Sequence, residues 1–199
     1  MKRVIVFALM MSMGFFASTA CAEIYVSGNL GAAFINDADF EEPEGYTGKM
    51  SFDTGFGLTG AVGTTFENGT RVEVEVGYYD NDINELKFDG FGTRKVDGDI
   101  QVISAMANGY LNFSENWMFS PFVGAGLGAA NIKVDPYLIN NEEDDVFAYQ
   151  VMLGAAAPLD ETLTVDFQYR FFGVNDPDFK DYEFEYSSHN LMVGIRKSF

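Results

Sequence analysis

The sequence predicts an all-β protein, an eight-stranded antiparallel, up-and-down transmembrane β-barrel. Eight segments alternate between apolar and polar residues with a period of two, as strands with two different faces do. Short turns alternate with long acidic connections, which is typical of a membrane barrel with one short-looped rim and one long-looped rim. The last segment places Leu191, Val193, Ile195 and Phe199 on one face and ends at that aromatic residue.

The first 22 residues have the features of a secretory signal, so the barrel domain is expected over residues 23–199. A basic start at Lys2 and Arg3 precedes an apolar run over residues 4–17, and small residues follow at 20–22. The apolar run is too short to span a membrane comfortably. A lipoprotein signal is the alternative because of Cys21, but Ser18 stands where Leu is usual. Removal of the signal would leave a chain without cysteine.

The eight strands follow in order, each with an apolar face that is expected to point outward. The first four are predicted at about 24–34, 50–66, 71–78 and 100–113. The third has the clearest alternation, with Val72, Val74 and Val76 opposite Arg71, Glu73 and Glu75. The last four are predicted at about 117–130, 146–157, 162–172 and 189–199.

The connections divide the predicted barrel into two unlike ends. Tight turns at 67–69, 114–116 and 158–161 follow the second, fourth and sixth strands. The other connections, at 35–49, 80–99, 132–146 and 173–186, are long and carry net charges of −4, −3, −4 and −4. Loss of the signal removes two cations, so the net charge changes from −18 to −20. Such acidity argues against a nucleic acid as the partner.

The interior of the predicted barrel carries charges of both signs. Arg71, Arg170 and Arg196 are expected to face the lumen together with Asp53, Glu73, Glu75 and Asp166. A soluble lipocalin-like barrel is the alternative architecture, but it keeps its apolar face inward. Balanced charges inside a narrow lumen favour the membrane barrel. Eight strands leave an interior that side chains fill, so a wide pore is not expected.

The motif at 121–128 (PFVGAGLG), the FQYRF strand at 167–171 and the Phe-terminated last strand resemble the small outer-membrane β-barrel superfamily. This group includes OmpA-like transmembrane domains, opacity-type porins and related surface antigens. The resemblance implies a Gram-negative outer-membrane location, periplasmic termini and insertion by the barrel-assembly machinery. That machinery would read the last strand through Leu191, Val193, Ile195 and Phe199. Lys197 departs from the pattern, since such strands more often carry an apolar residue there.

Catalysis is not expected, although a few small barrels of this kind modify lipid A or cleave proteins. The chain has one histidine, His189, and of the two serines before it only Ser187 shares its face of the last strand. No cofactor is expected either. Weak binding of Ca²⁺ or Mg²⁺ is conceivable at two acid clusters, but a solvated, mobile loop is the favoured interpretation of both. The clusters are Asp37, Asp39, Glu41 and Glu42, and Glu142, Glu143, Asp144 and Asp145.

The function predicted from these features is that of a surface-exposed, non-enzymatic barrel with acidic extracellular loops, an interaction or adhesion antigen. Its expected partners are outer-membrane lipid and, through the loops, a cationic or host surface molecule. A narrow porin or OmpW-like transporter of small solutes is the main alternative. A lipid-modifying enzyme and a soluble lipocalin-like carrier are weaker ones.

Overall fold

The computed structural model describes residues 23–35, 38–41, 47–88, 92–113, 118–136, 142–175, 178–179, 182–183 and 186–199. The strands are β1 (Glu23–Ile35), β2 (Ala38–Glu41), β3 (Thr47–Phe52), β4 (Gly55–Thr65), β5 (Thr70–Phe88), β6 (Gly92–Asn112), β7 (Ser120–Pro136), β8 (Glu142–Pro158), β9 (Leu163–Val174), β10 (Asp178–Phe179), β11 (Tyr182–Glu183) and β12 (Ser187–Ser198). No helix in this described part is long and apolar enough to cross a membrane.

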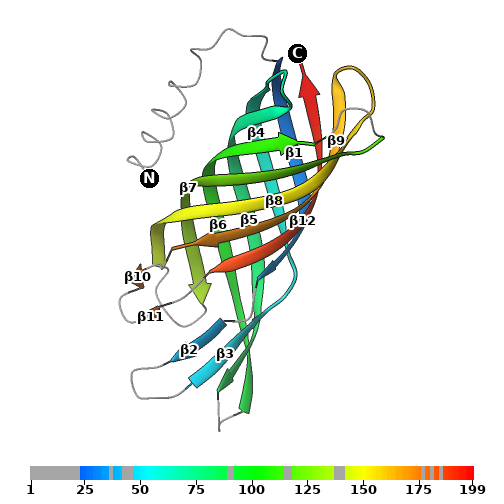
Figure 1. Ribbon diagram of the computed structural model, residues 1–199. Helices are drawn as coiled ribbons and strands as arrows, with labels where there is room; N and C mark the ends of the chain where they lie inside the picture. Colours follow the sequence, from blue (N-terminus) through cyan, green and yellow to red (C-terminus); the bar gives the residue numbers. More distant parts are fainter. Residues whose placement is uncertain are drawn as a thin grey trace.

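Eight of these strands close into an antiparallel barrel, which confirms the predicted fold class (Figure 1). Around the barrel the order is β1, β4, β5, β6, β7, β8, β9 and β12, and β12 returns to β1. Leu30 lies opposite Val193 across the closing pair and opposite Leu58 on the other side. Closure leaves the barrel itself without a free sheet edge, because each of its strands has a neighbour on both sides.

Glu23, the first described residue, and Phe199, the last, lie at the same end of the barrel. We call this the terminal end. The turn at 67–69 is also there: Gly69 adopts a φ of 78°, which glycine tolerates best, and the Phe66 N–H donates to the Thr70 carbonyl over 2.8 Å. In the turn at 158–161, three groups donate to the Asp160 carboxylate: the N–H groups of Thr162 and Leu163 and the Thr162 hydroxyl. These donors lower the pKa of Asp160. The turn predicted at 114–116 falls outside the described residues.

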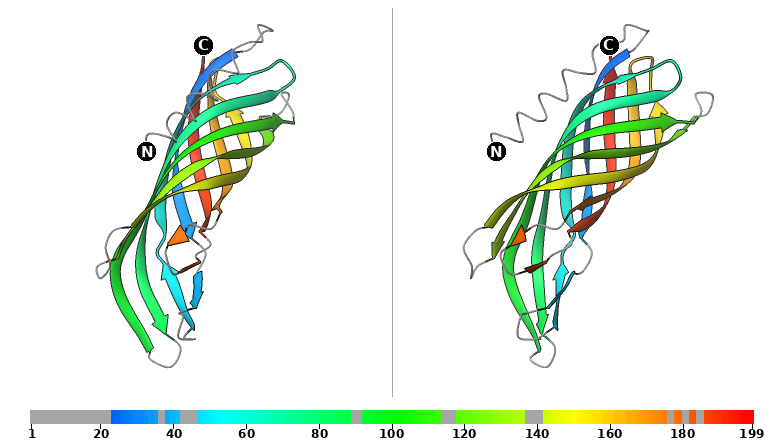
Figure 2. Two further views of the ribbon diagram at one scale, coloured as in Figure 1. Left: turned by 90° about the vertical axis from the view of Figure 1, so that its left-hand side faces the viewer. Right: turned by 60° about the vertical axis from the view of Figure 1, so that its left-hand side comes forward.

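The opposite end, which we call the distal end, differs from the prediction of four long loops. β5 and β6 continue as a ribbon as far as Phe88 and Gly92, and β3 pairs with β5 along this extension (Figure 2). β7 and β8 likewise reach Pro136 and Glu142. The expectation of loops at 80–99 and 132–146 is therefore wrong. Polar, charged composition does not exclude a strand, because antiparallel strands in water satisfy their backbone hydrogen bonds without an apolar face.

The predicted second strand, residues 50–66, is in fact two strands separated at Asp53 and Thr54. β3 pairs with β2 and β5, whereas β4 pairs with β1 and β5. The buried Asn81 side chain fixes this break, because its amide donates to the backbone carbonyls of Ala33 and Asp53 over 2.9 and 3.3 Å. The break allows the chain to leave the barrel at the distal end and return to it.

The two faces of the barrel wall are inverted relative to a soluble protein. Large apolar side chains such as Leu30, Val76 and Leu127 are exposed outward, each at 59 or 60%. Arginine, glutamate, asparagine and glutamine are instead buried inside. Exposed apolar surface of this extent on a monomer indicates a membrane or partner contact.

Candidate functional site

A bidentate ion pair crosses the middle of the barrel interior. Arg170 on β9 donates from Nη1 and Nη2 to the two carboxylate oxygens of Glu75 on β5, each over 2.7 Å. Nη1 also donates to the Tyr79 hydroxyl over 3.0 Å, and the Gln150 amide donates to Glu75 Oε1 over 3.1 Å. Both charged side chains are 0% exposed. A paired geometry of this kind is the condition under which a protein interior accepts two charges.

Glu73 forms a second cluster, one step closer to the terminal end on β5. Its carboxylate accepts hydrogen bonds from Tyr25 over 2.8 Å, from Tyr110 over 2.7 Å and from Asn108 over 3.0 Å. The Gln150 amide donates to Asn108 over 2.7 Å, so the Glu73 cluster is joined to the Glu75 pair. Side chains from β1, β5, β6, β8 and β9 are thereby linked across the lumen.

Asp166 is shared by two guanidinium groups nearest the terminal end. Arg196 Nη2 lies 3.2 Å from one of its oxygens and Arg71 Nη1 lies 3.9 Å from the other. Arg71 also stacks on aromatic rings, 4.5 Å from the Tyr110 centroid and 5.0 Å from that of Phe122. Aromatic faces stabilise a buried cation through their quadrupole. The three lumen arginines are thus balanced by three carboxylates.

Side chains fill the lumen around this network. A side-chain carbon at Gly124 would overlap the Tyr110 ring, and one at Gly126 would overlap the Asn108 amide. These β7 glycines therefore leave space for larger neighbouring side chains. Next to Arg71 and Asp166 there remains a cavity of about 10 Å³. A volume of about 10 Å³ is the space of one water molecule and is too small for a hydrated ion.

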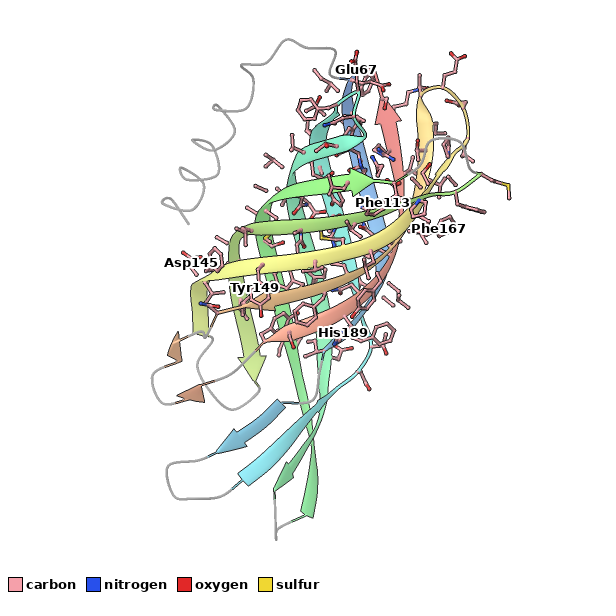
Figure 3. All side chains as sticks on the ribbon, in the orientation of Figure 1. Glu67, Phe113, Asp145, Tyr149, Phe167 and His189 are labelled. Carbon is pink, nitrogen blue, oxygen red and sulfur yellow. The ribbon has the colours of Figure 1, made fainter. Side chains whose placement is uncertain are left out.

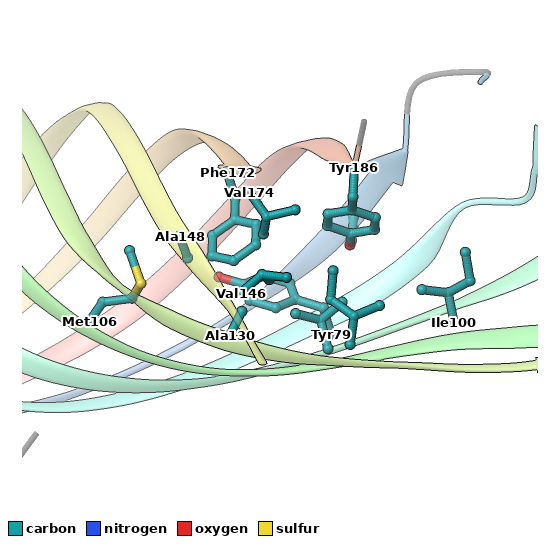
Figure 4. Packing of buried hydrophobic residues seen from close by; sticks show 12 residues of the cluster. Tyr79, Ile100, Met106, Ala130, Val146, Ala148, Phe172, Val174 and Tyr186 are labelled. Atoms are coloured by element: carbon teal, nitrogen blue, oxygen red, sulfur yellow. The ribbon is translucent and has the colours of Figure 1, made fainter. Parts of the chain in front are cut away.

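An apolar cluster occupies most of the distal half of the interior, beside the buried polar side chains of Asn81, Ser188 and Asn190. Twelve buried residues form this cluster (Figure 4), among them Tyr79, Ile100, Ile132, Phe172 and Tyr186. The Tyr79 and Phe172 rings lie 5.4 Å apart. The sequence signal for this cluster is the inward parity of β6, β7 and β8, where apolar residues such as Ile100, Val102 and Ile132 occupy inward positions. Among the described residues, the polar network is therefore capped on its distal side by an apolar layer.

Most of the predicted lumen charges meet inside the barrel, but one does not. Arg71, Glu73, Glu75, Asp166, Arg170 and Arg196 are all buried in the clusters described above. Asp53 is exposed between β3 and β4, so its assignment to the lumen network is wrong. A continuous strand over 50–66 would place Asp53 on the lumen face, but β3 ends at Phe52 and β4 begins at Gly55. The break at Asp53 places this residue beyond the barrel wall.

The two acid clusters lie at the distal end, partly in strands. Asp39 and Glu41 belong to β2, and Asp37 and Glu42 fall outside the described residues. Glu142, Glu143, Asp144 and Asp145 begin β8 and pair with β7, so the expectation that they form a loop is wrong. The Asn131 amide donates to Asp145 over 3.1 Å. Within the described part of the chain, no group of three potential metal-ligating side chains comes together.

The last strand presents its apolar residues on the outer wall. Leu191, Val193, Ile195 and Phe199 are exposed, and the Phe199 N–H donates to the Ile24 carbonyl over 2.9 Å. Lys197 lies close to the terminal end, where its ammonium group donates to the Thr162 hydroxyl over 2.6 Å. The polar end of Lys197 is thus held at the rim, away from the apolar belt.

His189 also faces the outer wall, nearer the distal end (Figure 3). Its Nδ1 lies 2.5 Å from the Tyr169 hydroxyl, and its ring stacks on that of Tyr169 with centroids 5.9 Å apart. The Phe171 ring lies 5.4 Å away on the same wall. The nearest polar partner of the imidazole is therefore a tyrosine.

Comparison with known proteins identifies the family through sequence. The model of the outer membrane protein beta-barrel domain matches residues 4–196. A candidate adhesin of Rickettsia conorii is 29% identical over 117 residues, which cover 48% of this chain and 47% of that protein. An uncharacterised Brucella abortus protein is 26% identical over 198 residues, covering 78% of this chain and 69% of its own length. The chain thus spans about half the length of the rickettsial adhesin it matches.

Solved structures share the architecture. The neisserial surface protein A superposes with a TM-score of 0.60 at 19% identity, over 90% of this chain and 99% of that one. The Escherichia coli outer membrane protease OmpT gives 0.54 at 9% identity, over 89% and 97%. At such identities the likeness extends to the fold alone. Together with the family match, it establishes that this chain belongs to the outer membrane protein beta-barrel domain family and is a transmembrane protein of the Gram-negative outer membrane.

Proposed function

We propose that the protein is a non-enzymatic surface barrel that acts through its extracellular side, as an interaction or adhesion antigen. Short turns mark the periplasmic end of such barrels, so the distal end is extracellular. The observation that carries the proposal is the filled interior: a compensated polar network lies under an apolar cluster. Because side chains fill this interior, we assign the function to the outer surfaces of the barrel. The candidate rickettsial adhesin supports the same assignment.

The partner that fits the extracellular side is cationic or is bridged by Ca²⁺ or Mg²⁺. The four distal segments, 35–49, 80–99, 132–146 and 173–186, each carry a net negative charge. A field of one sign attracts oppositely charged partners and raises their association rate. It also repels the phosphate groups of neighbouring lipids unless cations intervene.

Neutralising the start of β8, as Glu142→Gln, Glu143→Gln, Asp144→Asn and Asp145→Asn together, is expected to weaken binding of an oligolysine peptide. We expect the association rate at low salt to fall about tenfold, the lower limit of electrostatic steering. Surface plasmon resonance on the barrel in nanodiscs measures it, with ⁴⁵Ca²⁺ retention in parallel. The matched control is Glu67→Gln with Glu161→Gln, which removes carboxylates from the periplasmic turns. Equal binding by both variants and the wild type would exclude the acidic surface as the binding site.

Transport is the alternative that the interior argues against. The Arg170–Glu75 pair blocks the middle of the lumen, and the apolar cluster lies distal to it. We expect the wild-type protein to show no sustained single-channel steps in planar bilayers. Steps that change in size with Glu75→Gln would instead support a narrow porin, since that substitution alters charge at the constriction with little change in volume.

Catalysis is not part of the proposal. The similarity to OmpT concerns the fold at 9% identity. His189 is bonded to Tyr169 and surrounded by aromatic rings on the outer wall. A general base needs a nucleophile or a second acid within hydrogen-bond reach in a water-filled site. The proposed function also includes a route to this membrane. Residues 1–22 would be removed as a signal, and the assembly machinery would recognise β12 and insert the barrel.

A further inference from the structure

Arg71, in the cluster nearest the terminal end, is buried but uses little of its capacity to donate hydrogen bonds. A guanidinium group has five N–H donors and no acceptor. The Arg71 side chain is only 3% exposed, and among the described residues its Nε and Nη2 have no hydrogen-bond partner. Its Nη1 lies 3.9 Å from Asp166 Oδ2, which is too long for a direct hydrogen bond. Buried donors of this kind cost free energy unless another group accepts from them.

The aromatic neighbours of Arg71 do not supply that acceptor. The guanidinium group stacks on the rings of Tyr110 and Phe122, 4.5 and 5.0 Å from their centroids. Stacking uses the face of the guanidinium plane, whereas the N–H groups lie in that plane. The donors of Arg71 therefore remain available in the direction of Asp166. A polar contact longer than about 3.5 Å is one that a bridging water molecule can complete.

The small lumen cavity lies where such a bridge would be needed. Arg71 and Asp166 both line it, together with polar side chains that include Ser27 and Gln168. Its volume of about 10 Å³ is the space of one water molecule. A buried water molecule usually makes two to four hydrogen bonds to polar groups. The lining offers guanidinium donors, a carboxylate acceptor and the Ser27 hydroxyl, which can donate or accept.

The charges around the cavity favour a neutral ligand over an ion. Glu73 and Asp166 line it with two negative charges, and Arg71 and Arg196, which is bonded to Asp166, carry two positive ones. These formal charges cancel, so an added ion would leave an unpaired charge inside the barrel. An unpaired buried charge is costly. A water molecule adds no charge, and it can accept from a guanidinium group while it donates to a carboxylate.

We propose that this cavity is a binding site for one water molecule, which bridges Arg71 to Asp166. The water accepts a hydrogen bond from Nε or Nη2 of Arg71 and donates one to the Asp166 carboxylate, with the Ser27 hydroxyl as a third partner. The lumen network then has two kinds of ion pair. Arg170 and Glu75 are in direct contact, whereas Arg71 and Asp166 are joined through water. The site lies inside the barrel and does not depend on the surface function proposed above.

Arginine side-chain NMR tests the bridge directly. The barrel is labelled with ¹⁵N at arginine, deuterated elsewhere and placed in nanodiscs of deuterated phosphatidylcholine, and the Arg71 Nε–H resonance is assigned by its loss in Arg71→Lys. We expect cross peaks between this proton and water with opposite signs in NOE and ROE spectra, as a bound water gives. Peaks of the same sign, which report proton exchange with bulk water, or no peaks at all would overturn the proposal. A shift of this resonance when gluconate replaces chloride in the buffer would also overturn it, because an anion would then occupy the site.

Two substitutions of Ser27 change the space beside Arg71 in opposite directions. Ser27→Val adds methyl groups at a position that lines the cavity, so we expect it to displace the water and abolish the cross peaks. Ser27→Ala removes only the hydroxyl and leaves the space, so the cross peaks should remain. Both variants should keep the heat-dependent gel shift of a closed barrel, and the wild-type spectrum remains decisive if Ser27→Val does not fold. Unchanged cross peaks in a folded Ser27→Val variant would contradict the proposal, because the water would then lie outside this cavity.

Discussion

Arg170→Met is expected to lower the free energy of unfolding by about 3–5 kcal/mol, because it leaves a buried carboxylate without its partner. Glu75 would keep hydrogen bonds only from neutral groups among the described contacts, the Gln150 amide 3.1 Å from Oε1 and the Thr59 hydroxyl. Tyr79 would lose its bond to Nη1 as well. Urea titration in lipid vesicles measures the effect, with the unheated and heated gel bands reporting the folded fraction.

The double variant Glu75→Leu with Arg170→Met tests the reason for that loss. Apolar replacements of similar volume often restore what a broken buried pair costs, so the double variant is expected to be more stable than Arg170→Met alone. Lys197→Ala is the control. It removes an exposed hydrogen bond to Thr162 and should cost at most about 0.5 kcal/mol. A double variant no more stable than Arg170→Met would mean that the pair stabilises the barrel through its surrounding bonds, and not through charge compensation.

The membrane-spanning part of this fold was predictable because lipid imposes a strict period on it. Outward residues such as Val74 and Leu111 must be apolar, and inward residues such as Glu75 and Asn108 need partners instead. The period therefore indicated which charges would meet in the lumen. The period did not indicate which carboxylate each arginine would pair with. Arg170 pairs with Glu75, which is 95 residues away, and this depends on the tilt and register of strands that share no local signal.

The distal end was poorly predicted for the opposite reason. Beyond the membrane, an antiparallel strand needs no apolar face, so Lys87, Arg94 and Glu143 can belong to strands as well as to loops. Without an apolar face, such a strand shows no period-two alternation of apolar and polar residues, so periodicity does not identify it. Asp53 shows the consequence: it shares the expected parity of a lumen residue but follows the end of β3, where that parity no longer applies.

Val193→Arg is expected to destabilise the barrel by about 2–4 kcal/mol in a bilayer, the cost of a cation near the centre of the lipid-facing wall. Val193 is 51% exposed and lies between Leu30 on β1 and Phe167 on β9, both of which also face outward. The same exposed position on a water-soluble barrel would tolerate arginine within about 0.5 kcal/mol. A loss of about 2–4 kcal/mol of stability would therefore indicate that lipid, and not water, surrounds the outer wall.

Met118→Arg provides the matched comparison, because it introduces the same cation at a position that is 80% exposed beside the periplasmic rim. Near the interface an arginine costs about 0–1 kcal/mol, since its side chain reaches the headgroups. Urea unfolding in vesicles of two acyl-chain lengths would separate the two sites further. Thicker hydrocarbon should increase the cost of Val193→Arg and leave that of Met118→Arg nearly unchanged. Equal costs at the two positions would contradict a wall whose middle lies in hydrocarbon, and the difference between them measures how deeply β12 is immersed.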